Sequence, residues 1–204
     1  MSKRQYDNTY PSVTQILGVL RKPGLENWFK VNTPQYIKEK SSLGKKIGTE
    51  IHEAISQNIL TGQTEFETQH PEEVGTALKS FILFRSEHPE IELKLSEVAL
   101  TSEVYKFNGT IDCPCPPILV DWKSSEAKDK DKPAIYDEYR YQVSAYFYLW
   151  NELMSPKMQE TYIVAIAKDK VAYNLCRMLK AEIDACFQEV FLPTLKIYNY
   201  QHAK

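Results

Sequence analysis

The sequence is poor in cysteine, and its few cysteines are not spaced as metal ligands. The four are Cys113, Cys115, Cys176 and Cys186. None of them lies in a Cys-x-x-Cys pair, the spacing that zinc ribbons and ferredoxin-type clusters need. We therefore expect reduced thiols, as in proteins of the cytosol, and no iron–sulfur cluster.

Long apolar runs and glycine-rich loops are missing as well. No apolar run approaches the ~20 residues that cross a bilayer, and the first residues lack the apolar core of a signal peptide. The seven glycines form no phosphate-binding loop and no nucleotide fingerprint, which argues against enzymes of other phosphate esters. These absences predict a protein that binds no membrane and resides in the cytoplasm.

A strong positive charge is also absent. The net charge is −2, so the chain lacks the basic character of a protein that coats nucleic acid. An enzyme acting on nucleic acid stays open, because a cleft needs only local positive charge. The composition, 43% hydrophobic and 25% charged, is that of a globular chain. With 204 residues, no repeat and no long linker, we expect one domain spanning residues 1–204.

Several segments have the apolar spacing of helices. Apolar residues recur every three to four positions from Leu43 to Ile59, from Pro71 to Phe84 and from about Ala134 to Met154. A final amphipathic helix is predicted from about Leu179 towards Tyr200, and Pro193 should bend or split it. The stretch before Leu43 is polar and rich in lysine, so the helix is predicted to begin at Leu43.

Other segments have the period of two that is typical of strands. Ile91 to Glu97 alternates apolar and polar residues and is predicted to pair as a hairpin with Ser102 to Asp112. Ile118 to Lys123 is short and apolar enough to be a central strand, and Glu160 to Ala167 and Val171 to Met178 follow as further strands. The order of elements predicts a single α/β domain with a central mixed β-sheet flanked by helices.

Two aspartates and a lysine stand in adjacent predicted strands. Residues two apart on a strand point to the same face, so Asp121 and Lys123 project together, and Asp112 reaches them if the strands pair. Carboxylates suit Mg²⁺ or Mn²⁺, and the Trp122 backbone carbonyl could add a ligand. A water activated by the metal would attack a phosphodiester, while Lys123 orients that water and neutralises developing charge.

Further candidate residues lie on either side of these strands. His52 is on a predicted helix, one turn after Gly48, which leaves room for a neighbouring backbone. Its imidazole would favour tolerance of Mn²⁺. Glu97 falls in phase with the apolar positions of its predicted strand, an unusual place for a carboxylate. Gln142 and Tyr146 are four apart and so share a helix face, where they could hold DNA beside the cut.

Each of these residues also has an interpretation without catalysis. Asp-x-Lys occurs by chance in many proteins, a lone His52 is more often an ordinary helix-face residue, and the Gln–Tyr pair is more often packing. Glu97 could be an edge-strand charge that discourages aggregation, and Glu92 or Glu103 could be argued in its place. The conjunction of all the motifs in one order is what favours a functional site.

In this conjunction the sequence resembles the PD-(D/E)XK nuclease superfamily, and within it the RecB-type branch. That branch has a helix with Gly-x-x-x-His, a strand glutamate, Gly-x-x-Asp, Asp-x-Lys and Gln-x-x-x-Tyr. The matching residues, in the same order, are Gly48-Thr49-Glu50-Ile51-His52, Glu97, Gly109-Thr110-Ile111-Asp112, Asp121-Trp122-Lys123 and Gln142-Val143-Ser144-Ala145-Tyr146. The segment Pro11 to Leu17 also resembles the opening of small phage or viral members.

The resemblance implies a restriction-endonuclease-like core at about residues 43–178, a mixed sheet flanked by helices. It implies His52, Asp112 and Asp121 as ligands of Mg²⁺ or Mn²⁺ and Lys123 as the catalytic lysine, with Glu97 in support. Some relatives bind an iron–sulfur cluster through one upstream and three late cysteines, a pattern that this chain lacks. The helicase domains of larger relatives are absent too, so unwinding would need a helicase or recombination partner.

The function predicted from the sequence is a metal-dependent deoxyribonuclease, first of all an exonuclease on DNA ends or single strands in recombination, replication or repair. A structure-selective or single-strand endonuclease is the second reading. A catalytically idle DNA-binding or assembly module on the same fold is the third. Lys45 and Lys46, within the basic stretch Lys38 to Lys46, and the loop Lys128 to Lys132 are predicted DNA contacts, although a run of charges is by default a solvated face.

Overall fold

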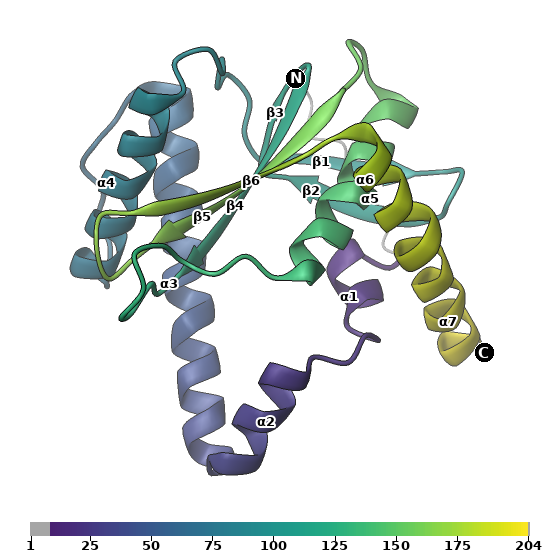
Figure 1. The fold of residues 1–204 in the computed structure, drawn as a ribbon, viewed down its shortest axis with the longest axis horizontal. Helices are drawn as coiled ribbons and strands as arrows, with labels where there is room; N and C mark the ends of the chain where they lie inside the picture. The colour runs from purple at the N-terminus through teal and green to yellow at the C-terminus, as the bar shows by residue number, and fades with distance from the viewer. Residues whose placement is uncertain (1–8, 204) are drawn as a thin grey trace.

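A four-stranded mixed sheet lies at the centre of the computed structural model, which describes residues 9–203 (Figure 1). Its strands, in spatial order, are β3 (Cys113–Cys115), β4 (Ile118–Ser125), β5 (Glu160–Ala167) and β6 (Tyr173–Met178). The central pair β4–β5 is parallel and the outer pairs are antiparallel. A parallel pair needs a crossover, and α5 (Asp137–Leu153) supplies it.

A two-stranded hairpin leads into this sheet. β1 (Val98–Ser102) pairs antiparallel with β2 (Phe107–Ile111), and Asp112 is the single residue between β2 and β3. The chain thus passes from the hairpin to the edge of the main sheet through one aspartate. This connection places Asp112 beside the central strands.

Helices cover both faces of the main sheet (Figure 1). The remaining helices are α1 (Val13–Leu17), α2 (Pro23–Val31), α3 (Pro34–Thr61), α4 (Pro71–Glu87), α6 (Lys180–Ala185), a π-helical turn (Cys186–Phe191) and α7 (Leu192–His202). α3 and α4 pack on one face, and α1, α5 and the C-terminal helices enclose a second core on the other. Successive side chains of β5 point to opposite faces of the sheet and so pack into both cores: Val164 and Ile166 face α3 and α4, whereas Ile163 faces α5.

The predicted α/β domain with a mixed sheet flanked by helices is confirmed. The helix predicted from Pro71 is present with its proline in the first turn, and the C-terminal helix is divided as predicted, with Pro193 in the first turn of α7. Across residues 9–203, no helix combines the length and apolar character needed to traverse a bilayer.

The strand predicted at Ile91 to Glu97 is wrong. This segment joins no ladder: the Leu93 N–H donates to the Ile91 carbonyl in a tight turn, and the first strand of the hairpin begins at Val98. Its alternation is nevertheless real, because Ile91 and Leu93 are buried against the core between α3, α4 and the sheet. A period of two in the sequence thus indicates which residues of this segment are buried, but it does not show that the segment has a hydrogen-bonded partner strand.

The predicted start of the long helix is also wrong. α3 begins at Pro34, with the Thr33 hydroxyl accepting from the Tyr36 N–H as an N-cap, well before Leu43. Residues 34–46 have no buried side chain, so no apolar stripe marks them as helical. Periodicity finds only the half of the helix that packs on the core.

Candidate metal centre

The two predicted strand aspartates face each other across β3 and β4. The ladder pairs Cys113 with Val120, so the next pair outward is Asp112 with Asp121. Directly opposed residues of antiparallel strands are ~5 Å apart at their Cβ atoms. The Asp112 carboxylate also crosses to β4, where its Oδ2 accepts a hydrogen bond of 2.9 Å from the Trp122 N–H. The strand predicted at Ser102 to Asp112 does not itself pair with Ile118 to Lys123, because β2 pairs with β1 in a separate sheet. The short strand β3, which directly follows Asp112, is the one that pairs with β4 and brings the two aspartates together.

His52 and Glu97 join Asp112 at one point. His52 Nδ1, on α3, lies 3.8 Å from Asp112 Oδ2 and 3.7 Å from Glu97 Oε1. One potential ligand atom from each of the three residues lies within 4.8 Å of the others. Glu97 reaches this place from a loop: its φ is +54°, in the left-handed region, and its N–H donates to the Asp112 carbonyl over 2.9 Å. This bond fixes Glu97 beside Asp112 without a strand.

Asp121 and Lys123 project together from β4, as their spacing predicts. Lys123 Nζ lies 2.6 Å from Asp121 Oδ2 and 5.4 Å from the ring centroid of Tyr139 on α5. The side chain between them, Trp122, points to the opposite face and packs edge-on against Phe81 of α4 at 5.3 Å. A bulky anchor on one face thus holds the acid and the lysine on the other.

The centre holds more negative charge than its own cations neutralise. Asp121 is fully buried, and although Lys123 is close to it, neither Asp121 oxygen has an aligned hydrogen bond within residues 9–203. The pKa of Asp121 is raised to about 6, chiefly by burial and in part by the charge of Asp112, against the attraction of Lys123. Burial likewise raises the pKa of Asp112, against His52 and Lys123.

The pKa values of the two basic groups are raised as well, although burial acts to lower them. Burial opposes the charged form of His52, but the carboxylates of Asp112 and Glu97 outweigh it and raise its pKa. Burial also opposes the charge on Lys123, and Asp121 and Asp112 together overcome it, so its pKa is raised as well. Acids with raised pKa values beside bases with raised pKa values mark a site short of positive charge.

A divalent cation fits this donor set. His52, Glu97 and Asp112 offer one imidazole nitrogen and carboxylate oxygens, the ligands that Mn²⁺ and, for the oxygens, Mg²⁺ accept. The buried carboxylate of Asp121 is the orphaned polar group that an added positive charge would satisfy. The cluster consists of His52, Glu97 and Asp112. Asp121 and the Trp122 carbonyl, which the sequence predicts as further ligands, are not part of this cluster and stay predictions.

The centre opens into a cleft of about 640 Å³ along α3. Its lining residues are Gly48, Thr49, His52, Glu53, Ser56, Gln57 and Glu97. The expectation that Gly48 makes room for another backbone is wrong, because an added Cβ would meet only the Ser124 hydroxyl, at an ordinary 3.6 Å. Gly48 therefore lines the cleft and makes no close backbone contact.

Gly109, unlike Gly48, lies in close contact with a neighbouring helix. A Cβ on Gly109 would lie 2.8 Å from Leu149 Cδ2 and 2.9 Å from Tyr146 Cε1, both on α5. The glycine of the Gly-x-x-Asp motif therefore lets α5 approach β2. Tyr146 is 5% exposed, and its hydroxyl accepts a 2.8 Å hydrogen bond from Gln142 Nε2, which confirms that the two share a face. Their predicted contact with DNA stays a prediction.

Two residues near Lys123 were not found from the sequence. Tyr139 places its ring against the ammonium, and Glu138 adds a negative charge that helps to raise the pKa of Lys123. A signal was available for Tyr139, since it precedes Gln142 by three and Tyr146 by seven residues and so lies on their helix face. Glu138 leaves no such pattern, because it takes part through tertiary contact.

Solved structures with this architecture exist, whereas no protein-family model and no curated protein matches the sequence. A candidate exonuclease from Eubacterium rectale has a TM-score of 0.58 at 13% identity, covering 100% of this chain and 88% of that chain. The two chains share a fold. This similarity confirms the restriction-endonuclease-like core. A phage-related exonuclease from Haemophilus somnus has a TM-score of 0.44 at 15% identity, with coverages of 93% and 91%.

Proposed function

We propose that this protein is a metal-dependent nuclease that hydrolyses phosphodiester bonds in DNA. The observation that carries the proposal is the convergence of His52, Glu97 and Asp112, next to the buried Asp121–Lys123 pair, with His52 and Glu97 lining an open cleft. The fold shared with the Eubacterium rectale candidate exonuclease supports a nuclease over an unrelated hydrolase. Filled acidic and basic positions favour an active enzyme over an idle DNA-binding module.

The residues of the centre take distinct roles in this proposal. His52, Glu97, Asp112 and Asp121 would hold Mg²⁺ or Mn²⁺, and the Trp122 carbonyl would complete the set. When bound, the ion supplies Lewis-acid chemistry, which makes water nucleophilic near neutral pH. Lys123, held as the charged ammonium, orients the attacking water and stabilises charge on the phosphoryl oxygens.

The substrate is proposed to be DNA, with cleavage from ends or single strands. Gln142 lies on the α5 face that carries Tyr139 and Tyr146, and it is oriented by the Tyr146 hydroxyl, so it would contact the sugar–phosphate backbone beside the cut. The exonuclease name of the Eubacterium rectale protein favours action from ends over internal cleavage. Recombination, replication or repair, with a helicase supplying single strands, is the setting that suits such an enzyme.

A cleavage assay tests this function directly. End-labelled single-stranded and duplex linear DNA and closed circular DNA are incubated with the protein in Mg²⁺, in Mn²⁺ or in EDTA. We expect linear DNA to be degraded to short products with either ion, circles to be spared and EDTA to abolish activity. Cleavage of circular single strands would make the protein an endonuclease instead.

Matched variants decide whether the proposed centre is responsible. Lys123→Ala should lower kcat by about 10²-fold or more, because a donor aimed at developing charge is worth that much. Lys79→Ala, which removes an exposed lysine on the outer face of α4, should leave activity unchanged. Wild-type protein that cuts no DNA with any ion, or Lys123→Ala protein that cuts at the normal rate, contradicts the proposal.

A further inference from the structure

The first helical hairpin of the chain stands apart from both hydrophobic cores. We name residues 22–46, comprising α2 and the first half of α3, the arm; Figure 1 shows it extending away from the sheet. None of its described side chains is buried, and the first buried residue of α3 is Ile47. An ion pair of 3.0 Å between Lys22 and Glu138 ties the arm to α5. Such a hairpin contributes little to the stability of the core, so its exposed side chains are available for binding another molecule.

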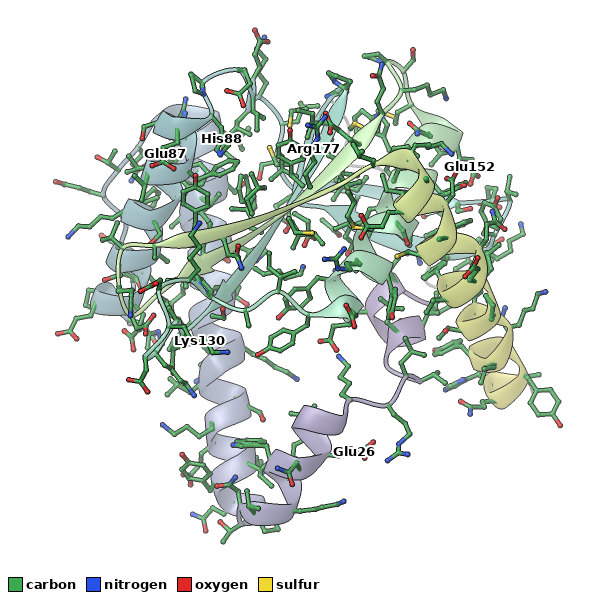
Figure 2. The ribbon with its side chains drawn as sticks, in the orientation of Figure 1. Glu26, Glu87, His88, Lys130, Glu152 and Arg177 are labelled. Atoms are coloured by element: carbon green, nitrogen blue, oxygen red, sulfur yellow. The ribbon has the colours of Figure 1, made fainter. Side chains whose placement is uncertain are left out.

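The arm has the opposite charge to the rest of the protein. It contains six lysines and two glutamates, a net charge of +4, while the whole chain carries −2, so the remainder carries −6. One of its two acids, Glu26, is itself neutralised by Arg21 at 2.6 Å (Figure 2 labels Glu26). Within residues 9–203, the arm lysines Lys30, Lys38, Lys45 and Lys46 have no ion-pair partner, and all are exposed. Free cations concentrated on an otherwise acidic protein favour a polyanionic ligand.

Aromatic rings are exposed between these lysines. Phe29 is 44% and Tyr36 is 43% exposed, and Trp28 lies between them, with ring centroids 5.5 Å from Phe29 and 6.4 Å from Tyr36. Lys40 lies 5.7 Å from the Tyr36 ring centroid. Lysines interleaved with exposed rings are the surface that binds unpaired nucleic acid, because unpaired bases can stack on the rings while the cations contact phosphates. Duplex DNA offers its phosphates but not its base faces.

The arm leads to the metal centre along one face of α3. Lys38, Lys45 and His52 are spaced by seven residues, close to two helical turns, so they share a face. At a rise of ~1.5 Å per residue, each step along this face is ~10 Å. This line of side chains runs from the arm to His52, which lines the cleft. Lys22, at the other end of the arm, is tied to Glu138, whose charge acts on Lys123.

We infer that the arm is a docking surface for single-stranded DNA that guides the strand along α3 into the metal centre. This inference rests on the proposed nuclease function and adds to it the binding element and the preference for unpaired bases. A second copy of the chain is the weaker occupant, because two arms of charge +4 would repel each other.

Equilibrium binding without catalysis tests the arm by itself. Dye-labelled oligothymidine and a duplex of equal length are titrated in EDTA and followed by fluorescence anisotropy. The double variant Phe29→Ala/Tyr36→Ala should weaken oligothymidine binding by about tenfold or more, since each stacked base is lost, and should change duplex binding by less than about twofold. Lys38→Gln/Lys45→Gln should weaken both and lower the salt slope by ~1.4, at ~0.7 per contact with a single strand.

Controls use exposed residues of the same type elsewhere. Tyr200→Ala removes a ring that is 86% exposed on α7, and Lys79→Gln removes a cation on α4; both should bind as wild type does. All arm variants should unfold at the wild-type temperature, because no described arm side chain is buried. Equal oligothymidine affinity of wild-type and arm variants, including no binding by either, overturns the inference. The inference is also overturned if the wild-type protein is a dimer and the Phe29→Ala/Tyr36→Ala variant becomes a monomer while its affinity for DNA stays unchanged.

A small substrate separates this inference from the nuclease proposal. Bis(p-nitrophenyl) phosphate is too short to reach from the metal centre to the arm, so arm variants should hydrolyse it at the wild-type rate while losing activity on oligothymidine. Lys123→Ala should lose both. If wild-type protein hydrolyses neither substrate but the arm variants still lose affinity for oligothymidine, the nuclease proposal fails and the docking surface stands.

Discussion

Replacing Asp121 by asparagine should stabilise the metal-free protein. Asp121 is 0% exposed, and its pKa is raised from 3.8 to about 6 by burial, with Lys123 pulling the other way and Asp112 adding to the rise. The attraction of Lys123 is already included in this balance. The shift corresponds to about 3 kcal/mol of unfavourable free energy in the charged carboxylate. Asparagine has the same shape without the charge, and Lys123 keeps Asp112 as a counter-charge.

The gain should depend on pH in a defined direction. A carboxyl with a raised pKa in the folded state gives stability that is complete below pH 3.8 and is lost as the pH rises through about 6. Relative to wild type, Asp121→Asn should therefore gain up to about 3 kcal/mol at pH 8 and roughly half of that at pH 5, where wild type is largely protonated. For a chain of this size each kcal/mol raises Tm by about 2–4 °C.

Urea denaturation in EDTA at the two pH values measures this difference. The control is Asp169→Asn, because the N–H groups of Ala127 and Lys128 lower the pKa of Asp169 in spite of its partial burial. That substitution should destabilise the protein, and by the same amount at pH 5 and pH 8. Asp121→Asn protein that is less stable than wild type at pH 8 would refute the argument that this site carries uncompensated negative charge.

Three further outcomes are expected. Gly109→Ala should lower the free energy of unfolding by about 1–3 kcal/mol, since its Cβ would lie within 2.9 Å of α5, whereas Gly75→Ala, with open space around it, should raise it. Asn58→Ala should lower the free energy of unfolding by about 1–3 kcal/mol, because the Asn58 side-chain amide donates to the Gln63 carbonyl and accepts from Arg85. Urea denaturation measures the free energy of unfolding of these three variants. Saturating Mn²⁺ should raise Tm by several degrees in wild type and by much less in His52→Ala; an equal rise in both would place the ion elsewhere.

The elements that sequence periodicity predicts well are those packed on a core. β4, β5 and α4 were predicted because their apolar residues alternate or recur with the helical period against buried neighbours. The start of α3 was missed because residues 34–46 touch no core and so have no apolar stripe. Ile91 to Glu97 was predicted as a strand because its apolar and polar residues alternate, and an irregular segment that buries Ile91 and Leu93 alternates in the same way.

The same division holds at the metal centre. Motif spacing alone placed Asp121 with Lys123 and Gln142 with Tyr146, because residues two apart on a strand or four apart on a helix must share a face. The spacing could not decide which acids lie next to His52. That depends on the left-handed turn at Glu97 and on the bond from its N–H to Asp112, contacts between segments distant in sequence.

Sequence by itself determined the residue types, their order and the faces of each element on which they lie, because these follow from local backbone geometry. Tertiary structure decided the rest: the register that sets Asp112 opposite Asp121, the packing of α5 on Gly109, and the grouping of His52 and Glu97 with Asp112. The physical reason is that strand register and loop closure are set by burial of both cores together, which no short window of sequence contains.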